Sequence, residues 1–185
     1  MLKRAFDIVV ASAGLLALAL PMALIALWVR LDSPGPALHW SQRFGANGVL
    51  FAMPKFRSMP IDTPQVATHL LADGASRVTR AGRILRRTSL DELPQLLSVL
   101  RGEMSLVGPR PALFNQHDLM DLRRAAGVDG LRPGITGWAQ VNGRDELALE
   151  EKVAFEAEYL ARQSFVFDLL IVLRTFARGS HGVAH

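Results

Sequence analysis

The apolar run from Ile8 to Val29 constrains the fold most, because only Ser12, Gly14 and Pro21 interrupt it. As a helix with a rise of about 1.5 Å per residue the run would extend roughly 33 Å. That length is enough to cross a hydrocarbon core of about 30 Å. A cleaved signal peptide is the alternative, but the run is longer than the usual apolar region of about 7–15 residues in such peptides. The sequence therefore predicts a membrane anchor.

Two topologies are compatible with this anchor. In one, the run is a single spanning helix. In the other, it bends at Pro21 and leaves by the face it entered, because proline removes a backbone donor and clashes with the preceding turn. Lys3 and Arg4 precede the run and Arg30 follows it, whereas a spanning helix usually has its positive bias on one side. The sequence alone leaves both topologies open.

The composition limits the partners and the chemistry. The chain has 185 residues, of which 50% are hydrophobic, and its formal net charge is +4. This charge favours anionic partners such as lipid headgroups or phosphorylated substrates. There is no cysteine, which excludes disulfides, thiolate metal sites and a cysteine nucleophile. Aromatic residues make up only 7%, which is sparse for base stacking, so we expect no nucleic-acid partner.

The turn formers between Leu31 and Pro36 mark a boundary, so we expect an anchor over 1–31 and a catalytic domain over 32–185. Strands at 37–42 and 49–53, with Asn47-Gly48 between them, predict a small β-hairpin. Helical patterns are predicted over 77–100, 113–126, 145–161 and 165–177, with a long loop over 127–143. The expected fold class is α+β and predominantly helical.

The adjacent carboxylates Asp91 and Glu92 are the most informative pair in the chain. Ser89 and Glu92 fit a capping box at a helix N-terminus, with Asp91 beside the positive end of that helix. Pro94 would then fall inside the helix, where its missing N–H leaves the Leu90 carbonyl without a donor. The helix is therefore expected to start later or to bend.

A second interpretation of this pair is chemical. Arginines precede it at positions 77, 80, 83, 86 and 87, and arginine binds phosphate oxygens through bidentate hydrogen bonds. An aspartate can attack phosphorus and form an acyl phosphate. A neighbouring glutamate can accept a proton or help to hold magnesium, which prefers one or two carboxylates plus substrate phosphates. The parts needed for phosphoryl transfer are therefore close together in sequence.

Several longer motifs follow one another along the chain. They are Lys3-Arg4-Ala5-Phe6-Asp7, Val29 to Pro36, Gln42-Arg43-Phe44-Gly45, Lys55-Phe56-Arg57-Ser58-Met59, Ser89 to Leu96, Met104 to Pro111 and Arg132 to Arg144. In this order they resemble the bacterial sugar transferase family, the small monotopic polyprenyl-phosphate phosphoglycosyl transferases. The resemblance covers nearly the whole chain. It implies a re-entrant membrane helix broken near Pro21, amphipathic interfacial helices, and a place on the cytoplasmic face of the bacterial inner membrane.

The resemblance also implies an enzyme, a sugar-1-phosphate transferase with a ping-pong mechanism. Asp91 would attack the β-phosphorus of a UDP-sugar and release UMP. Polyprenyl (undecaprenyl) phosphate would then take the phospho-sugar and become a polyprenyl-diphosphate-sugar, in the first membrane step of glycoconjugate or exopolysaccharide assembly. Mg²⁺ is the expected cofactor, held by Asp91 and Glu92. Inner-membrane lipids are expected partners, a homodimer is left open, and both hexoses and N-acetylhexosamines fit as the sugar.

Other residues are assigned with the family pattern in view. Lys55, Arg86 and Arg110 are expected at substrate phosphates. Asn142, Gly143 and Arg144 are expected to form a turn at the nucleotide, with a structural turn as the alternative.

Two residues inside the predicted helices and loops have competing roles. Trp138 could stack on uracil or anchor at the membrane interface, and Asp168 is expected to be a structural partner for an arginine. The chain departs from the family pattern at Asp145 and Glu156, in a region that bears on substrate choice or on local packing.

Two other functions account for part of the sequence. A non-enzymatic basic module on a membrane surface would explain the anchor and the charge, but not adjacent carboxylates beside arginines. A membrane phosphotransferase with two metals would need more acids near the anchor, where only Asp7 and Asp32 lie.

Overall fold

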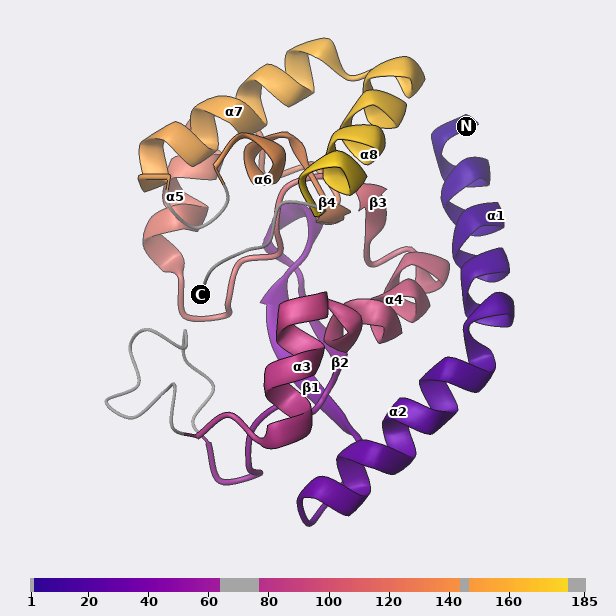
Figure 1. The fold of residues 1–185 in the computed structure, drawn as a ribbon. Helices are drawn as coiled ribbons and strands as arrows, with labels where there is room; N and C mark the ends of the chain where they lie inside the picture. The colour runs from indigo at the N-terminus through magenta and orange to yellow at the C-terminus, as the bar shows by residue number, and fades with distance from the viewer. Residues whose placement is uncertain (1, 64–76, 144–146, 180–185) are drawn as a thin grey trace.

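The computed structural model describes residues 2–63, 77–143 and 147–179. Its elements (Figure 1) are α1 (Leu2–Ala17), α2 (Ala19–Asp32), β1 (Leu38–Phe44), the 3₁₀ helix η1 (Ala46–Gly48), β2 (Leu50–Phe56), α3 (Arg80–Thr88), the 3₁₀ helix η3 (Leu90–Gln95), α4 (Leu96–Arg101), β3 (Ser105–Val107), α5 (His117–Ala125), β4 (Gly134–Thr136), α6 (Trp138–Asn142), α7 (Leu149–Arg162) and α8 (Phe165–Gly179). The predominantly helical fold with a small hairpin is confirmed.

The N-terminal run forms two helices and not one. Within the described residues no single helix is long and apolar enough to cross a membrane, whereas α1 and α2 pass that test together, bent by 62°. The bend lies at Leu18, three residues before the predicted position at Pro21. The reason is local: a proline ring clashes with the carbonyl four residues earlier, which here belongs to Ala17. Pro21 itself sits in the first turn of α2, where its missing N–H costs little.

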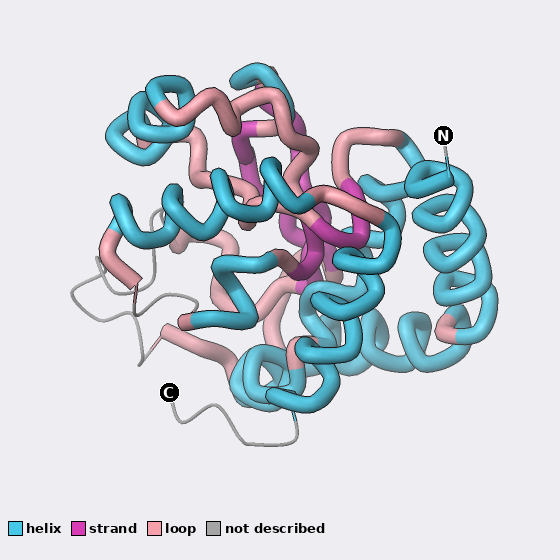
Figure 2. The backbone as a smooth tube through the Cα atoms, turned by 90° about the horizontal axis from the view of Figure 1, so that it is seen from above, coloured by secondary structure: helices cyan, strands magenta, loops and turns pink. Residues whose placement is uncertain are grey.

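The opening motif attaches α1 to the rest of the protein. Lys3 Nζ donates to Asp168 Oδ2 at 2.7 Å, and Arg4 donates to the carbonyls of Val99 and Leu100 at 2.6 and 2.9 Å. Asp7 is buried and accepts from Ser105 Oγ at 2.8 Å. The bent pair lies along one side of the molecule in both views (Figures 1 and 2). These bonds fix that side to the catalytic domain.

The hairpin forms where the Asn-Gly turn predicts it, with longer strands. β1 and β2 pair antiparallel from Leu38 opposite Phe56 to Phe44 opposite Leu50. Asn47 has φ +56°, a left-handed conformation that asparagine tolerates better than most residues. The hairpin packs against η3, which brings its second strand next to the carboxylate pair.

The single helix predicted over 77–100 is divided into α3, η3 and α4. The capping-box interpretation is wrong: Ser89 is the residue that ends α3, with φ +56°, and its side chain makes no cap bond. Pro94 lies inside η3 and is buried there. The expected bend at this proline is therefore confirmed as a 3₁₀ segment before α4.

The predicted loop over 127–143 is also wrong, since it contains β4 and α6. β4 pairs with β3 in parallel, Ser105 opposite Gly134 and Val107 opposite Thr136. A strand of three residues gives almost no periodic signal. The approach is close: a Cβ on Gly134 would lie 2.1 Å from the Gly108 nitrogen. Glycine is therefore required where these two segments cross.

The last three helices, α6, α7 and α8, surround one buried cluster. Val107, Trp138, Tyr159, Phe167 and Ile171 form its centre.

Asp168 belongs to the same region and accepts from Tyr159 Oη at 2.6 Å. Burial, followed by the bond to Asp168, raises the pKa of the Tyr159 hydroxyl. The structural role predicted for Asp168 is confirmed, but its cationic partner is Lys3 and not an arginine.

Candidate active site

The local fold around Asp91 comes from the junction between two helices. α3 carries a basic face and ends at Ser89, whose N–H bonds to Arg86 O at 3.2 Å. The chain then turns into η3, so Asp91 and Glu92 fall in the first turn of a short, tight helix. Asp91 is buried, with 7% of its surface exposed, while Glu92 is half-buried. One carboxylate is thus shielded from water and its neighbour is not.

Lys55 from β2 lies directly against this pair. Its Nζ donates to Glu92 Oε1 at 2.7 Å. Burial raises the pKa of the Asp91 carboxyl, Lys55 lowers that pKa, the charge of Glu92 raises it and Arg86 lowers it. Asp91 is therefore a buried carboxylate whose charged form is favoured by two nearby cations, which suits a nucleophile better than a solvated surface charge.

Arg86, on the last turn of α3, also acts electrostatically on Asp91. Its Nε donates to Ser58 Oγ at 2.9 Å. Burial lowers the pKa of the Arg86 guanidinium and the Asp91 charge raises it. Arg86 is the arginine predicted at a substrate phosphate, and its charge acts on Asp91, whereas its neighbour Arg87 is exposed.

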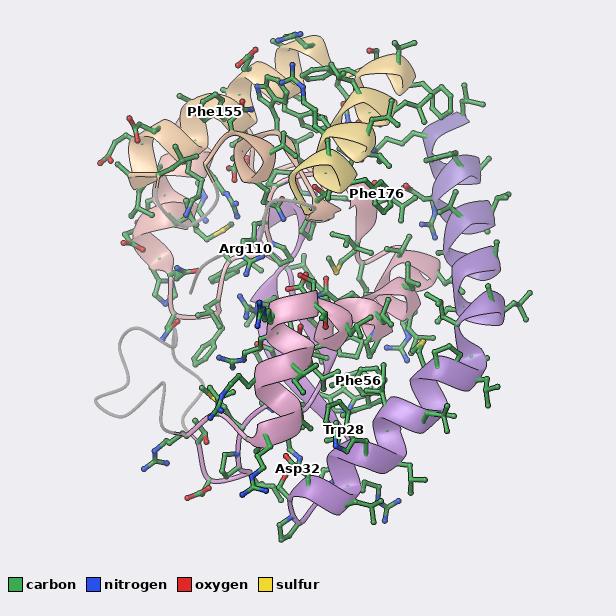
Figure 3. All side chains as sticks on the ribbon, viewed as in Figure 1. Trp28, Asp32, Phe56, Arg110, Phe155 and Phe176 are labelled. Atoms are coloured by element: carbon green, nitrogen blue, oxygen red, sulfur yellow. The ribbon has the colours of Figure 1, made fainter. Side chains whose placement is uncertain are left out.

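A small hollow opens beside Glu92 of the dyad. Its polar lining consists of Arg43, Lys55, Glu92, Gln95 and Arg110. Three of these side chains are cationic and come from separate segments, and cations converging on one hollow favour an anionic ligand. Figure 3 labels Arg110 between the hairpin and α5. Lys55 and Arg110, which are separate in sequence, are thus brought together.

Arg43 and Gln95 were not predicted at the site. Arg43 lies on β1, where its Nη1 donates to Pro111 O at 3.1 Å and its Nε to Ser41 Oγ at 3.0 Å. Its motif was visible in the sequence. No signal in the sequence indicates that β1 pairs with the segment that carries Arg110. In the structure the two segments are joined by an antiparallel bridge between Arg43 and Leu113.

The segment that carries Arg110 is held from several directions. Gly108 N donates to Thr136 O at 2.9 Å, and Gly134 N donates to Pro109 O at 2.8 Å. Arg123 Nη2 donates to the Arg110 carbonyl at 2.9 Å. The backbone on both sides of this arginine is therefore fixed at the rim of the hollow.

The described contacts of the predicted nucleotide turn are local to α6 and its end. Asn142 Nδ2 donates to Trp138 O at 2.7 Å, within α6, and Gly143 ends that helix against Leu147. The described contacts of both residues are thus structural. Arg144 and Asp145 lie outside the described residues.

Other side chains contact both the faces and the edge of the Trp138 ring. Arg174 and Arg162 lie 4.9 and 5.5 Å from the ring centroid, and Nε1 donates to Glu158 Oε2 at 2.8 Å. Only 8% of the residue is exposed. Both proposed roles, stacking on uracil and anchoring at the interface, are replaced by a place in the core.

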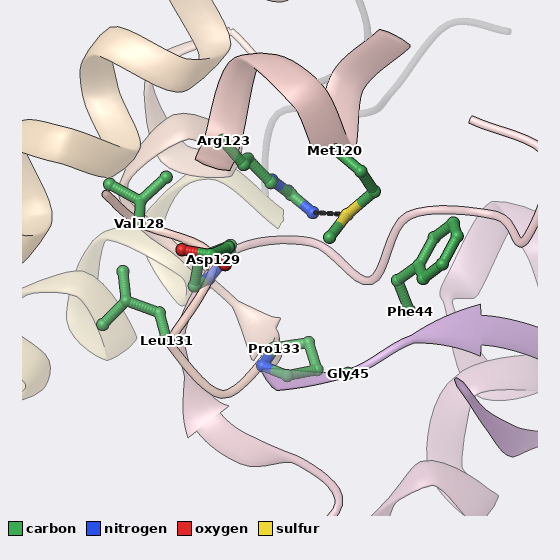
Figure 4. Close-up of a pocket in the computed structure, with 9 residues that line it drawn as sticks. Phe44, Gly45, Met120, Arg123, Val128, Asp129, Leu131 and Pro133 are labelled. Atoms are coloured by element: carbon green, nitrogen blue, oxygen red, sulfur yellow. Dashed lines mark hydrogen bonds between the residues drawn. The ribbon is translucent and has the colours of Figure 1, made fainter. Parts of the chain in front are cut away.

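A second hollow, of about 230 Å³, lies on the neighbouring side of the same segments (Figure 4). Phe44, Val128 and Leu131 give it a largely apolar lining. Arg123 lines it too, with Nη1 directed at Met120 Sδ at 4.0 Å, but this arginine is paired with the buried Glu156 at 2.7 Å. We therefore place the candidate site at the dyad.

The departure from the family pattern at Glu156 has a packing explanation. Both Arg123 and Glu156 are buried, and the pair joins α5 to α7. This departure therefore concerns packing around the Arg110 segment.

The donor set for a metal is small. Within the described parts of the chain no group of three or more His, Cys, Asp or Glu side chains could hold a metal ion. Magnesium needs only one or two carboxylates when substrate phosphates complete its shell. Asp91 and Glu92, which are neighbours in the chain, supply that number of carboxylates.

Comparison with known proteins places this site in context. A family model described as bacterial sugar transferase matches residues 1–181. The UDP-glucose:undecaprenyl-phosphate glucose-1-phosphate transferase of Escherichia coli (strain K12) is 41% identical over 191 residues, covering 97% of this chain and 40% of that protein.

Two further relatives are shorter. A protein of the same name from Caulobacter vibrioides is 46% identical over 183 residues, covering 94% of this chain and 67% of that protein. The exopolysaccharide production protein ExoY of Rhizobium meliloti is 38% identical over 204 residues, covering 98% and 88%. The chain thus spans 40% of the length of the Escherichia coli protein and 88% of the length of ExoY.

Proposed function

This chain belongs to the bacterial sugar transferase family, and we propose that it transfers a phospho-sugar from a UDP-sugar to undecaprenyl phosphate. The observation that carries the proposal is the buried Asp91, whose charge is favoured by Lys55 and Arg86. Its neighbour Glu92 lines a hollow together with the cations Arg43, Lys55 and Arg110. Two relatives are named for UDP-glucose and undecaprenyl phosphate, so UDP-glucose is the first donor to test.

In the first half-reaction a carboxylate oxygen of Asp91 attacks the β-phosphorus of the donor. A bond forms between that oxygen and phosphorus, and the bond from phosphorus to the bridging oxygen breaks. UMP leaves with the electron pair of the broken bond. Lys55, Arg86, Arg110 and Arg43 balance the charge of the two phosphates, which an attacking carboxylate would otherwise repel.

In the second half-reaction a phosphate oxygen of undecaprenyl phosphate attacks the same phosphorus. The Asp91–phosphorus bond breaks, the carboxylate is restored and undecaprenyl-diphosphate-sugar is formed. The half-buried Glu92 keeps Lys55 at the site in both steps through their 2.7 Å ion pair.

Mg²⁺ is the proposed cofactor, with Asp91 and Glu92 as its protein ligands and phosphate oxygens completing its shell. When bound it supplies charge neutralisation at the phosphates. A cation bound by both carboxylates would also reduce the repulsion between Asp91 and Glu92.

We also propose that α1 and α2 enter the bacterial inner membrane from the cytoplasmic face and return to it. The 62° bend supports this topology, as does the exposed apolar surface of both helices at Val9, Leu16, Leu20, Leu24 and Leu27.

α8 has a similar apolar stripe at Val166, Leu173 and Phe176, exposed by 75, 67 and 77%. We propose that this stripe rests on the lipid surface. Tags at Met1 and His185 are then both expected on the cytoplasmic side, whereas tags on opposite sides would require a spanning helix.

The reaction is tested by UMP release with UDP-glucose and undecaprenyl phosphate, compared across wild type, Asp91→Asn and the surface control Asp121→Asn. We expect turnover in wild type and control, and none in Asp91→Asn with its folding and membrane association unchanged. A panel of UDP-hexoses and UDP-N-acetylhexosamines in the same assay identifies the sugar. Near-normal activity of Asp91→Asn would refute the nucleophile.

A further inference from the structure

The turn from Asp32 to Pro36 and the buried Arg57 are prominent in the sequence, yet neither touches the dyad. We propose that Asp32, Ser33 and Arg57 form a latch that sets the position of Asp91 relative to the membrane anchor. Asp32 and Arg57 are thus positioning residues. The inference rests on the proposed function, because it takes the acceptor phosphate to lie at the membrane surface.

The first part of the latch caps α3 from the anchor. Asp32 is the last residue of α2, and its Oδ2 accepts from Ala81 N at 3.0 Å. Thr79 Oγ1 accepts from Gly82 N at 2.9 Å. The first N–H groups of a helix have no partner within the helix. In α3 one of them is bound by Thr79, the helix's own cap, and another by Asp32 of the membrane helix α2. Figure 3 labels Asp32 at the end of α2, beside the first turn of α3.

The second part ties β2 to the same turn. Arg57 follows directly after β2 and only 4% of it is exposed. Its Nη1 and Nη2 donate to Ser33 Oγ and O, each at 2.7 Å, and its Nε donates to Pro36 O at 2.7 Å. Lys55 lies two residues earlier in the chain. The end of α2 is therefore bonded to the strand that carries Lys55 as well as to the helix that leads to Asp91.

α3 is also prevented from sliding against its neighbours. A Cβ on Gly82 would lie 2.2 Å from Ser58 O, so the helix approaches that backbone as closely as glycine allows. Arg86 Nε bonds to Ser58 Oγ at the other end of the same helix.

Beneath these polar contacts, Val29 of α2 packs in one buried cluster with Phe56, Ala81 and Leu85. If the start of α3 moved away from Asp32, the end of α3 at Ser89 would therefore move with it, and so would Asp91.

The two substrates should respond differently to such a displacement. A UDP-sugar is soluble in water and can follow the site wherever it moves. The phosphate of undecaprenyl phosphate is held at a depth set by the bilayer, which also sets the depth of α2. Because a misplacement of about 1 Å can cost about 100-fold in rate, loss of the latch should slow transfer to the acceptor more than loading from the donor.

The test separates the two half-reactions of the full chain in lipid vesicles. UMP release from UDP-glucose alone, or from the UDP-sugar that supports turnover, measures loading. Addition of vesicles containing undecaprenyl phosphate to the loaded enzyme measures transfer. Asp32→Ala should slow transfer by about tenfold and loading by no more than about twofold. Asp32→Asn keeps a capping oxygen and should restore transfer.

Asp118→Ala is the matched control, since Asp118 Oδ1 likewise accepts from a backbone N–H in the first turn of a helix, that of Leu119 in α5 at 2.8 Å, and both of its rates should match wild type. If Asp32→Ala does not fold, Arg57→Lys removes the fork to Ser33 while keeping the charge, and the same selective loss is expected. Equal slowing of both half-reactions, unchanged transfer, or failure of Asp32→Asn to restore transfer would overturn the latch. Failure of wild type to release UMP would instead refute the proposed function.

Discussion

Lys55 Nζ lies 2.7 Å from Glu92 Oε1, so a cation from the hairpin meets the carboxylate next to Asp91. This contact joins residues 37 positions apart in the chain. It makes the ionisation of Asp91 depend on a residue in another element, since Lys55 lowers the pKa of Asp91 and Glu92 raises it.

The pH dependence of activity follows from this relationship. Asp91 must be ionised to attack, and its pKa is raised above the ordinary value by burial, so activity should fall with decreasing pH from a higher pH than for an ordinary aspartate. Lys55→Met removes a charge that lowers this pKa and should move the acid limb of kcat/KM upward. Glu92→Gln should move it downward. Both are measured as pH profiles of kcat/KM, which report the free enzyme. Identical acid limbs in all three proteins would contradict this account of Asp91.

Arg43 is predicted to bind the donor. Arg43→Gln should raise the KM for the UDP-sugar by about tenfold, because a charged hydrogen bond contributes about 1.5–3 kcal/mol. The control is Arg124→Gln, which removes the same charge from an exposed arginine paired with Asp121. Equal KM values for the UDP-sugar in the two variants would mean that Arg43 does not bind the donor.

Trp138 is predicted to act through packing alone. Trp138→Phe loses the bond to Glu158 and part of the contact with Arg174, so thermal unfolding in detergent should show a loss of about 1 kcal/mol. The KM for the UDP-sugar should stay at the wild-type value. A large rise in the KM for the UDP-sugar with unchanged stability would instead indicate that the Trp138 ring contacts the nucleotide.

The buried pair Arg123–Glu156 should show strong coupling. Arg123→Leu leaves the Glu156 carboxylate buried without its partner, which costs about 3–5 kcal/mol. The double replacement of both residues by leucine should cost less than either single change, because no unpaired charge remains. Chemical unfolding in detergent measures the free energy of unfolding of the single and double variants. The control is Arg124→Leu at the exposed neighbouring position, which should lie within about 0.5 kcal/mol of wild type. Additive effects would mean that the two side chains act independently.

Local signals in the sequence predicted much of this fold. The Asn47-Gly48 turn predicted the hairpin, and the break before Pro36 predicted the end of α2. The bend at Leu18 was misplaced by three residues, because the clash of Pro21 acts one turn upstream of the ring.

The errors arose where tertiary contacts outweigh local pattern. Ser89 and Glu92 satisfy a capping motif, but Glu92 forms an ion pair with Lys55 and Ser89 ends the helix before it. Arg43 and Gln95 could not be assigned, because the hollow they line is built from segments whose crossing has no signature in the sequence. Asp91 and Glu92 were proposed as a dyad because the motif from Ser89 to Leu96 resembles that of the family, whereas the local pattern alone also fitted a helix cap.

The central claim is that the phospho-sugar is carried on Asp91, and intact-protein mass spectrometry tests it most directly. Wild type incubated with the productive UDP-sugar and without acceptor should gain the mass of one phospho-sugar, located by peptide mapping at Asp91 and lost when undecaprenyl phosphate is added. Asp91→Asn should gain nothing. UMP release by wild type without added mass, or with the mass on another residue, would contradict the account.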